Sequence, residues 1–281
     1  MRTSIHHLAD MKRQGELIGM ITAYDYTSAR IVDEIGFPAV LVGDSMSQVM
    51  LGYGDTVPLT MDESLHHTRA VVRGTRRAHV VADMPFLSYN AEWPEAVRNA
   101  GRFLKEGGAQ SVKVEGGRHM TRAIRRMVAA GIPVMGHLGL TPQSVNQLGG
   151  YKVQGRSAGA ARRLLVDALA LEASGVYAIV LELVPAEVAR EVTARLTVPT
   201  IGIGAGPHCD GQIQVLHDVL GLFEVFVPKH TRRYAHMADD MRTALGRYLS
   251  DVREGAFPGD AESYHAPKDV VSAMVEDREQ N

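Results

Sequence analysis

Short apolar runs recur along the chain, and each is bounded by glycine, proline or charged residues. Eight of these runs are rich in valine, isoleucine, leucine and alanine, as expected of β-strands. They cover residues 19–25, 39–44, 79–84, 110–115, 133–138, 178–184, 199–204 and 223–228. Because apolar residues fill most positions and do not alternate with polar ones, the pattern predicts parallel strands that are buried on both faces.

Segments with the 3.6-residue period of helices lie between these runs. The clearest cover residues 61–74, 93–107, 118–130, 158–174, 186–196 and 211–220. Thr60 and Glu63 form a capping-box pattern, and Gly107, Gly131 and Gly175 stand where C-terminal caps are common. The repeated alternation predicts an α/β fold, a (β/α)8 TIM barrel. An open doubly wound sheet is the alternative, but the first strand–helix turn lacks the glycine fingerprint of that fold.

Two connections are longer than the rest, residues 45–60 and 139–157. Both follow the carboxyl end of a predicted strand, where barrel enzymes assemble their active sites, so we expect them to be lids or substrate-binding loops. We expect one barrel domain over residues 1–265, with a closing amphipathic helix at 234–254. Residues 266–281 are polar, and we expect them to form a mobile C-terminal tail.

Composition excludes several kinds of partner and compartment. The chain has 30 Lys and Arg against 32 Asp and Glu, a net charge of −2, which gives no overall attraction to nucleic acid or an anionic membrane. The N-terminus has no signal-peptide pattern, and no apolar stretch reaches the roughly 18 to 20 residues of a membrane helix. Cys209 is the one cysteine, so an internal disulfide is excluded. We therefore expect a cytoplasmic protein.

Carboxylates end three neighbouring predicted strands: Asp44, Asp83 and Glu115. A lone charge at a strand end commonly marks the point where the chain meets water. Several carboxylates at one barrel mouth repel each other, however, and a bound cation is the simplest compensation. Oxygen ligands without clustered His or Cys favour Mg²⁺. Any of the three could instead pair with a basic side chain at the barrel mouth. We predict that Asp44 and Asp83 bind the ion directly in preference to such a pair, whereas for Glu115 the pair and binding of the ion, directly or through water, both stay open.

Three further strand-end residues are candidates for roles in chemistry. Lys113 shares a strand face with Glu115, so it either forms a salt bridge with Glu115 or binds a substrate carboxylate or a developing enolate oxygen. Glu182, within the apolar run IVLELVP, suits a general base that works near neutral pH; capping of a helix N-terminus is the alternative. His137 either polarises a substrate oxygen or packs in the core against backbone.

Several longer strings resemble those of the ketopantoate hydroxymethyltransferase family. They include ITAYDYTSA, VLVGDSMS, VVADMPF, VKVEGG, GHLGLTPQSVNQLGGYKVQGR, LELVP and PTIGIGAGPHCDGQ, in order. The resemblance implies a TIM barrel of the Mg²⁺-dependent 2-oxo-acid superfamily, whose substrates resemble phosphoenolpyruvate and pyruvate. It implies transfer of the one-carbon unit of 5,10-methylenetetrahydrofolate to 3-methyl-2-oxobutanoate through a Mg²⁺-stabilised enolate. The product, ketopantoate, serves pantothenate and coenzyme A biosynthesis.

The resemblance and the strand-end pattern together give one set of site residues. These are Asp44, Asp83 and Glu115 for the metal, Asp44, Ser45, Asp83, Lys113 and His137 for the oxo acid, and Glu182 as the catalytic base. Ser45 enters through the resemblance alone. Another divalent cation in place of Mg²⁺ is allowed. The family forms large homo-oligomers, commonly decamers, so we expect a homo-oligomer with small-molecule partners, the oxo acid and folate, and with neither nucleic acid nor a membrane.

Two other functions fit parts of the pattern. The first is a Mg²⁺-dependent lyase of the same superfamily that breaks a carbon–carbon bond of a 2-oxo acid. Such lyases generally use a cysteine in a catalytic loop, whereas Cys209 lies outside both long connections. The second is a catalytically silent oligomeric barrel, which would be expected to lack the metal ligands or the base. The chain has both, so we favour the hydroxymethyltransferase.

Overall fold

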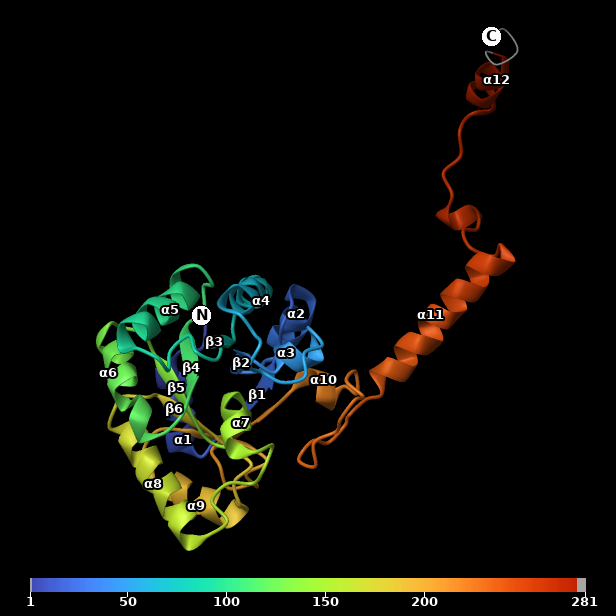
Figure 1. Cartoon of the computed structure of the whole chain (residues 1–281). Helices are drawn as coiled ribbons and strands as arrows, with labels where there is room; N and C mark the ends of the chain where they lie inside the picture. Colours follow the sequence, from blue (N-terminus) through green and yellow to red (C-terminus); the bar gives the residue numbers. More distant parts are fainter. Residues whose placement is uncertain (1, 277–281) are drawn as a thin grey trace. The chain divides into compact units, whose positions relative to one another are not determined.

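The eight strands of the chain form a closed barrel in the computed structural model, which describes residues 2–276. The strands are parallel and pair in chain order, and β1 pairs with β8 as well as with β2. Figure 1 shows strands β1 to β6 at the centre of the barrel. They are β1 (Ile18–Thr22), β2 (Ala39–Val42), β3 (His79–Asp83), β4 (Ser111–Glu115), β5 (Val134–Gly139), β6 (Ala178–Glu182), β7 (Thr200–Ile203) and β8 (Gly211–Gln214). The predicted TIM barrel is confirmed.

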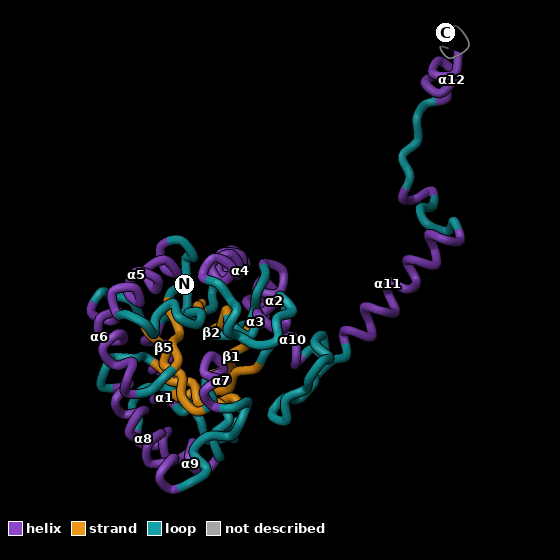
Figure 2. Tube along the Cα trace, in the orientation of Figure 1, coloured by secondary structure: helices purple, strands orange, loops and turns teal. Residues whose placement is uncertain are grey.

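Helices α2, α4, α5, α6, α8 and α9 form a ring outside the strands (Figure 2). The α-helices are α1 (Ile5–Gln14), α2 (Tyr26–Ile35), α3 (Met46–Val49), α4 (Met61–Gly74), α5 (Trp93–Lys105), α6 (Thr121–Ala129), α7 (Val145–Leu148), α8 (Ala158–Glu172), α9 (Ala186–Arg195), α10 (Leu216–Val219), α11 (Met237–Glu254) and α12 (Lys268–Glu276). Short 3-10 helices are η1 (Arg118–Met120), η2 (Pro142–Ser144) and η3 (Asp260–Glu262). Among the described residues, no helix is both long and apolar enough to cross a membrane.

The helix starts follow local sequence where capping residues are present. α4 begins with the predicted capping box, in which the Thr60 hydroxyl accepts from the Glu63 amide and the Glu63 carboxylate accepts from the Thr60 amide. Ser157 caps α8 in a similar way, by accepting from Ala160 N. These bonds satisfy amide groups that the first helical turn leaves without partners, which fixes where each helix begins.

Alternate side chains of the strands share one face, and the inward-facing ones stack in layers along the barrel. The buried apolar layer includes Met20, Leu41, Val81, Met135, Val180, Ile201 and Ile213, with Leu8 and Met11 of α1 packed against it. On β3, Asp83 comes two residues after Val81, and on β5, His137 comes two residues after Met135. The strand period therefore places the charged strand-end residues above an apolar layer, at the carboxyl end of the barrel.

The prediction of the eighth strand is wrong. β8 is Gly211–Gln214, inside a segment predicted to be helical, and residues 223–228 form no strand. A Cβ at position 211 would collide with the backbone oxygen of Ile18 on β1, so the close approach of the two strands requires Gly211. Ile213 is buried in the barrel interior, whereas Val225 is 87% and Phe226 67% exposed. The longer apolar run therefore misled the prediction.

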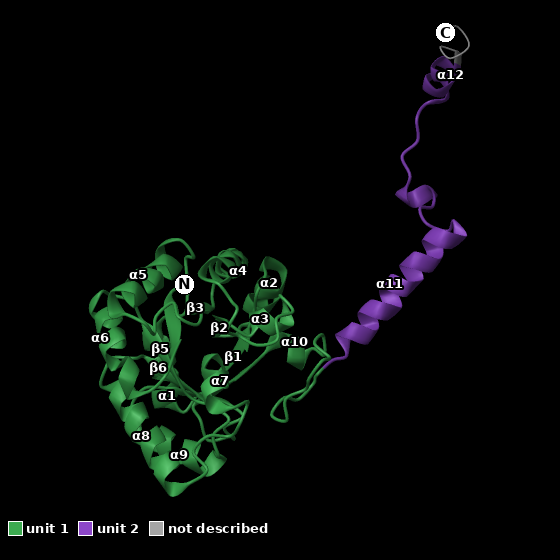
Figure 3. Cartoon of the chain, viewed as in Figure 1, with its two compact units in different colours: residues 1–234 green, residues 235–281 purple. Residues whose placement is uncertain are grey.

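The chain divides into two compact units, Met1–Tyr234 and Ala235–Asn281 (Figure 3). The first unit is the barrel, and the domain boundary expected after residue 265 falls inside the second. The helix expected at 234–254 is present there as α11, which has no buried residue. The second unit also contains α12, over residues expected to belong to a mobile tail. Residues 277–281 of that expected tail lie outside the described residues.

Candidate active site

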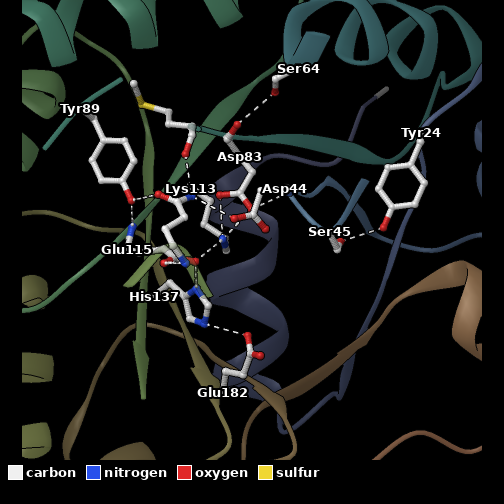
Figure 4. A network of polar contacts seen from close by, with 12 residues as sticks. Tyr24, Asp44, Ser45, Ser64, Asp83, Tyr89, Lys113, Glu115, His137 and Glu182 are labelled. Atoms are coloured by element: carbon white, nitrogen blue, oxygen red, sulfur yellow. Dashed lines mark hydrogen bonds and ion pairs between the residues drawn. The ribbon is translucent and has the colours of Figure 1, made fainter. Parts of the chain in front are cut away.

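A cavity of about 1010 Å³ opens at the carboxyl end of the barrel. The predicted site residues on its wall are Asp44, Ser45, Asp83, Lys113, His137 and Glu182. Glu115 lies beside this wall, fully buried among the same side chains (Figure 4). The structure thus brings all the residues predicted for the site into one cluster, which comes from five elements or their ends.

Asp83 and Lys113 form a buried ion pair at the centre of the cluster. The Lys113 Nζ lies 2.7 Å from Asp83 Oδ1 and 2.6 Å from Oδ2, and the Asp44 amide donates to Asp83 Oδ2 at 3.1 Å. Burial raises the pKa of Asp83; Lys113 opposes this shift, and the charges of Asp44 and Glu115 add to it. Burial lowers the pKa of Lys113, but the three carboxylates outweigh burial and raise it. Lys113 is therefore held as a cation.

The expected alternative for Lys113, a salt bridge to Glu115, is the weaker of its two contacts. Lys113 Nζ is 3.9 Å from Glu115 Oε1, compared with 2.6 Å from Asp83. Asp83 and Lys113 are direct partners in the register of β3 with β4, which explains why the shorter pair forms between strands. The lysine is also on the cavity wall, so the ion pair does not remove it from contact with a bound molecule.

His137 lies between two carboxylates. Its Nδ1 is 3.2 Å from Glu115 Oε1, and its Nε2 is 3.2 Å from Glu182 Oε2 (Figure 4). The second contact is close but too poorly aligned for a hydrogen bond, which leaves Nε2 without a hydrogen-bond partner among the described residues. Burial and Lys113 lower the pKa of His137, but Glu115 and Glu182 outweigh them and raise it to about 9. The two carboxylates therefore favour the imidazolium form of His137, and its ring has no hydrogen bond to backbone among the described residues.

Glu182 lies at the rim of the charged cluster. Its side chain is 17% exposed, compared with 3% for Glu115, so it is less buried than its apolar neighbours in the sequence suggest. It ends β6, and its backbone oxygen accepts from Leu140 N of the next connection. A Cβ at position 139 would collide with that oxygen, so the positive-φ glycine Gly139 lets the two segments meet. Glu182 thus faces the cavity from a fixed backbone.

Three neutral polar residues that the strand-end pattern does not single out complete the cluster. The Tyr24 hydroxyl pairs with Ser45 Oγ at 2.8 Å, and burial raises the pKa of Tyr24. Tyr89 accepts a hydrogen bond from Glu115 N and donates one to Gln143. None of these residues carries charge, so a search for charged strand ends misses them. Gln143 lies within the family-like string GHLGLTPQSVN, which is the signal that could have found it.

The residues present fit a divalent cation of the magnesium type. Asp44 and Asp83 lie against each other on the cavity wall. In the part of the chain that the structure describes, no three His, Cys, Asp or Glu side chains are arranged as a complete metal cage. Mg²⁺ does not need one, because it commonly uses one or two carboxylates and fills its shell with water and substrate oxygens. The four carboxyl groups of the cluster also exceed its two cations, Lys113 and His137.

Comparison with known proteins gives one consistent family. The model of the family described as ketopantoate hydroxymethyltransferase matches residues 2–260. A protein of Chloroflexus aurantiacus (strain J-10-fl), named 3-methyl-2-oxobutanoate hydroxymethyltransferase, is 55% identical over 275 residues, 98% of this chain and 97% of that protein. A protein of the same name from Dehalococcoides mccartyi (strain CBDB1) is 53% identical over 274 residues, 98% of each chain.

Solved structures show the same fold at much lower identity. The structure of a phosphonopyruvate hydrolase has a TM-score of 0.61 and 12% identity, and the comparison covers 100% of this chain and 97% of that one. The structure of 2,3-dimethylmalate lyase, a member of the PEP mutase/isocitrate lyase superfamily, has a TM-score of 0.59 and 17% identity, with 100% of both chains covered. At these identities the likeness establishes the barrel fold alone and says nothing of the reaction.

Proposed function

The chain belongs to the ketopantoate hydroxymethyltransferase family and is a transferase, and from this and the site geometry we propose that it transfers the one-carbon unit of 5,10-methylenetetrahydrofolate to 3-methyl-2-oxobutanoate. The product is 2-dehydropantoate (ketopantoate), for pantothenate and coenzyme A biosynthesis. One observation carries the proposal. A single cavity wall holds an aspartate pair suited to a cation and, beside it, the partly exposed carboxylate of Glu182.

Asp44 and Asp83 are the residues that would hold Mg²⁺, and Glu115 would act directly or through water. When bound, the ion would withdraw electron density from the oxo and carboxylate oxygens of the substrate and so acidify the proton on C3. Lys113, on the same wall, offers a fixed positive charge to the substrate carboxylate or to the oxygen on which charge develops. Ser45, held by the Tyr24 hydroxyl, offers a hydroxyl to the oxo acid.

Glu182 removes the C3 proton of the oxo acid in this proposal. Its carboxylate faces the cavity, and the ring of His137 lies 3.2 Å from it. The base is carried by a barrel strand instead of a mobile loop, which fixes its position relative to the substrate. His137 in turn is fixed by Glu115, so the base and the acidic cluster are connected through one histidine.

The carbanion at C3 then attacks the methylene carbon of the folate donor. A carbon–carbon bond forms, the carbon–nitrogen bonds of the methylene group break, and water supplies the hydroxyl group of the product. The proton taken from C3 and the remaining proton of water go to the two folate nitrogens, and tetrahydrofolate leaves. The cavity continues beyond the charged cluster along apolar residues such as Leu183, Pro185 and Phe226. Its volume of about 1010 Å³ exceeds what a five-carbon acid can fill, which supports a second, larger substrate in the same cavity.

The proposal also includes a homo-oligomer, with a decamer expected, and a cytoplasmic location. Both come from the family resemblance, and the lone cysteine suits a reducing compartment. Light scattering of the purified protein measures the assembly. A monomer at micromolar concentration would contradict that part of the proposal without affecting the chemistry.

Product formation tests the reaction itself. The purified protein is incubated with 3-methyl-2-oxobutanoate, Mg²⁺ and folate carrying a ¹³C-labelled methylene group, and the products are followed by NMR. We expect the label to appear in the hydroxymethyl carbon of 2-dehydropantoate, and this signal to disappear when the cation is chelated. A folded protein that leaves the label on folate would contradict the proposal. Cleavage of a longer 2-oxo acid instead would indicate the lyase.

A further inference from the structure

Gln143 is a buried glutamine with an unusually complete set of partners. It lies in η2, at the start of the connection from β5 to α8, and is 3% exposed. Its Nε2 donates to Asp44 Oδ2 at 3.0 Å and to the Met84 backbone oxygen at 2.9 Å. Its Oε1 accepts from the Tyr89 hydroxyl at 2.7 Å, and its backbone amide donates to Glu115 Oε2 at 3.1 Å.

The orientation of this amide follows from its neighbours. The backbone amide of Glu115 can only donate, so the Tyr89 hydroxyl accepts from it and has its one proton left for Gln143. The amide oxygen of Gln143 must therefore face Tyr89. The backbone oxygen of Met84 can only accept, which places the NH₂ group on the other side, toward Asp44. Gln143 thus presents a donor to Asp44. With the amide flipped, its oxygen would face the oxygens of Asp44 and Met84, and these three acceptors would have no hydrogen bond to one another.

We propose that Gln143 is a positioning residue that aims the carboxylate of Asp44 at the divalent cation and holds the carboxylate of Glu115 beside it. The inference rests on the metal site of the proposed function. Through its side chain Gln143 engages one oxygen of Asp44, which leaves Oδ1 for the ion. Through its backbone it engages one oxygen of Glu115, whose other oxygen faces His137. One residue of a long connection therefore sets the direction of two acidic groups that come from different strands.

A residue that holds a metal-binding side chain in place, without touching the ion, affects the affinity of the site for the metal. Groups that hold metal-binding side chains in place commonly change metal affinity by about 10- to 100-fold when they are removed. A glutamine that only packed the connection against the barrel would affect stability but not the affinity of the folded protein for the ion. The two roles therefore separate when metal binding is measured directly on a folded variant.

The test is calorimetric titration of the full-length protein with MgCl₂, comparing wild type with Gln143→Met. The methionine side chain is similar to that of glutamine in length and volume but cannot donate a hydrogen bond to Asp44. We expect the Kd for Mg²⁺ to rise about 10- to 100-fold. We also expect the rate of C3 proton exchange at saturating Mg²⁺ to return to within a few-fold of the wild-type rate, because Glu182 is untouched.

A matched control comes from the same connection. Gln154 donates through its side-chain amide to the Lys152 backbone oxygen, and among the described residues this amide has no hydrogen bond to a carboxylate. Gln154→Met makes the same chemical change, and we expect its Kd for Mg²⁺ to equal that of wild type. A similar weakening in both variants would show that the effect belongs to the connection as a whole and would overturn the proposal.

A second variant keeps the proposal testable if Gln143→Met does not fold. Tyr89→Phe retains the glutamine but removes the hydroxyl that fixes its orientation, and we expect a smaller rise in the Kd for Mg²⁺, about 3- to 10-fold. An unchanged Kd in a folded Gln143→Met variant, or in Tyr89→Phe when only that variant folds, would overturn the proposal. So would a loss of exchange that saturating Mg²⁺ does not restore. Wild type that neither binds Mg²⁺ nor exchanges the proton would instead contradict the proposed function.

Discussion

The barrel interior holds a buried polar network at each end, and the two networks differ in charge. The amino-end network consists of His79, Ser111 and Tyr177: His79 Nε2 pairs with Ser111 Oγ at 2.9 Å, and Ser111 Oγ with the Tyr177 hydroxyl at 2.9 Å. The carboxyl-end network consists of the charged cluster around Lys113, with four carboxyl groups and His137. The amino-end network has no residue on the cavity wall, whereas the carboxyl-end network forms that wall.

The two histidines show what distinguishes the networks. Both are 2% exposed and lie in strands. Burial lowers the pKa of His79 to about 4; the charge of Arg2 adds to this shift, and the hydrogen bond to the Thr3 backbone oxygen opposes it only in part. The pKa of His137 is raised to about 9, since two carboxylates outweigh burial and Lys113. Burial of a polar residue is therefore no sign of function by itself. Buried like charges beside a cavity are the more informative feature.

The largest effect should come from the base at the carboxyl end. We predict that Glu182→Gln lowers the rate of C3 proton exchange about 10²- to 10⁴-fold, because the general base is lost. The Kd values for Mg²⁺ and for the oxo acid should stay within a few-fold of wild type. Exchange is measured by NMR in D₂O and the affinities by calorimetry. Glu187→Gln, at an exposed position of α9, is the control. Unchanged exchange in Glu182→Gln would remove Glu182 from the mechanism.

The second prediction tests whether the Asp83–Lys113 ion pair stabilises the carboxyl-end network. We predict that Asp83→Ala weakens both Mg²⁺ and oxo-acid binding. It should also lower the free energy of unfolding by about 3–5 kcal/mol, because Lys113 is left buried without its nearest partner. Asp62→Ala removes the exposed Asp62–Arg102 pair and should cost less than about 1 kcal/mol. Full metal affinity in Asp83→Ala would show that the ligand assignment is wrong.

The amino-end network should become less stable as the pH falls, because the pKa of His79 is lowered, whereas a histidine with a raised pKa, such as His137, contributes more stability in acid. The folded-state pKa of His79, about 4, lies below the ordinary histidine pKa of 6.5. The neutral histidine therefore contributes stability that is present above pH 6.5 and is lost as the pH falls toward 4. The loss at pH 4.5 amounts to roughly 2–3 kcal/mol. Between pH 7.5 and 4.5, the free energy of unfolding of His79→Phe should therefore fall by roughly 2–3 kcal/mol less than that of wild type. Urea unfolding at the two pH values measures the difference. Equal losses would mean that His79 is not neutral when buried.

The smallest predicted effect compares two matched tyrosines. Tyr24 pairs with Ser45 at the carboxyl end at 2.8 Å, and Tyr177 pairs with Ser111 at the amino end at 2.9 Å. Replacement of either by phenylalanine should lower the free energy of unfolding by about 1 kcal/mol. In addition, Tyr24→Phe should raise the KM for the oxo acid about fivefold, because Ser45 loses its anchor. A KM change in Tyr177→Phe of the same size would erase the distinction between the two ends.

Much of this arrangement could be predicted from the sequence because it follows the two-residue period of the strands. Asp83, Glu115 and Glu182 end apolar runs, so they had to lie at the same end of a parallel barrel, and Lys113 comes two residues before Glu115 on the same strand face. β8 could not be predicted in this way, since a short Gly-Gln-Ile-Gln segment is stabilised by pairing with β1 and β7 and not by an apolar pattern of its own. Residues 223–228 have the pattern but no neighbouring strand.

The neutral members of the carboxyl-end network could not be predicted for a different reason. Gln143 and Tyr89 come from connections that are distant from Asp44 in the sequence, and their roles depend on which groups they meet after folding. A glutamine or tyrosine in a connection is common, and no spacing relates it to a particular carboxylate. The orientation of Glu182 against His137 is likewise a product of the register between β5 and β6.

The central claim is that the carboxyl-end network enolises a 2-oxo acid. The most direct test is NMR of C3 proton exchange into D₂O for 3-methyl-2-oxobutanoate with the wild-type protein, with and without Mg²⁺ and with no folate present. We predict exchange that depends on Mg²⁺ and does not require the one-carbon donor. No exchange from a folded, Mg²⁺-loaded protein, with or without added tetrahydrofolate, would contradict the account.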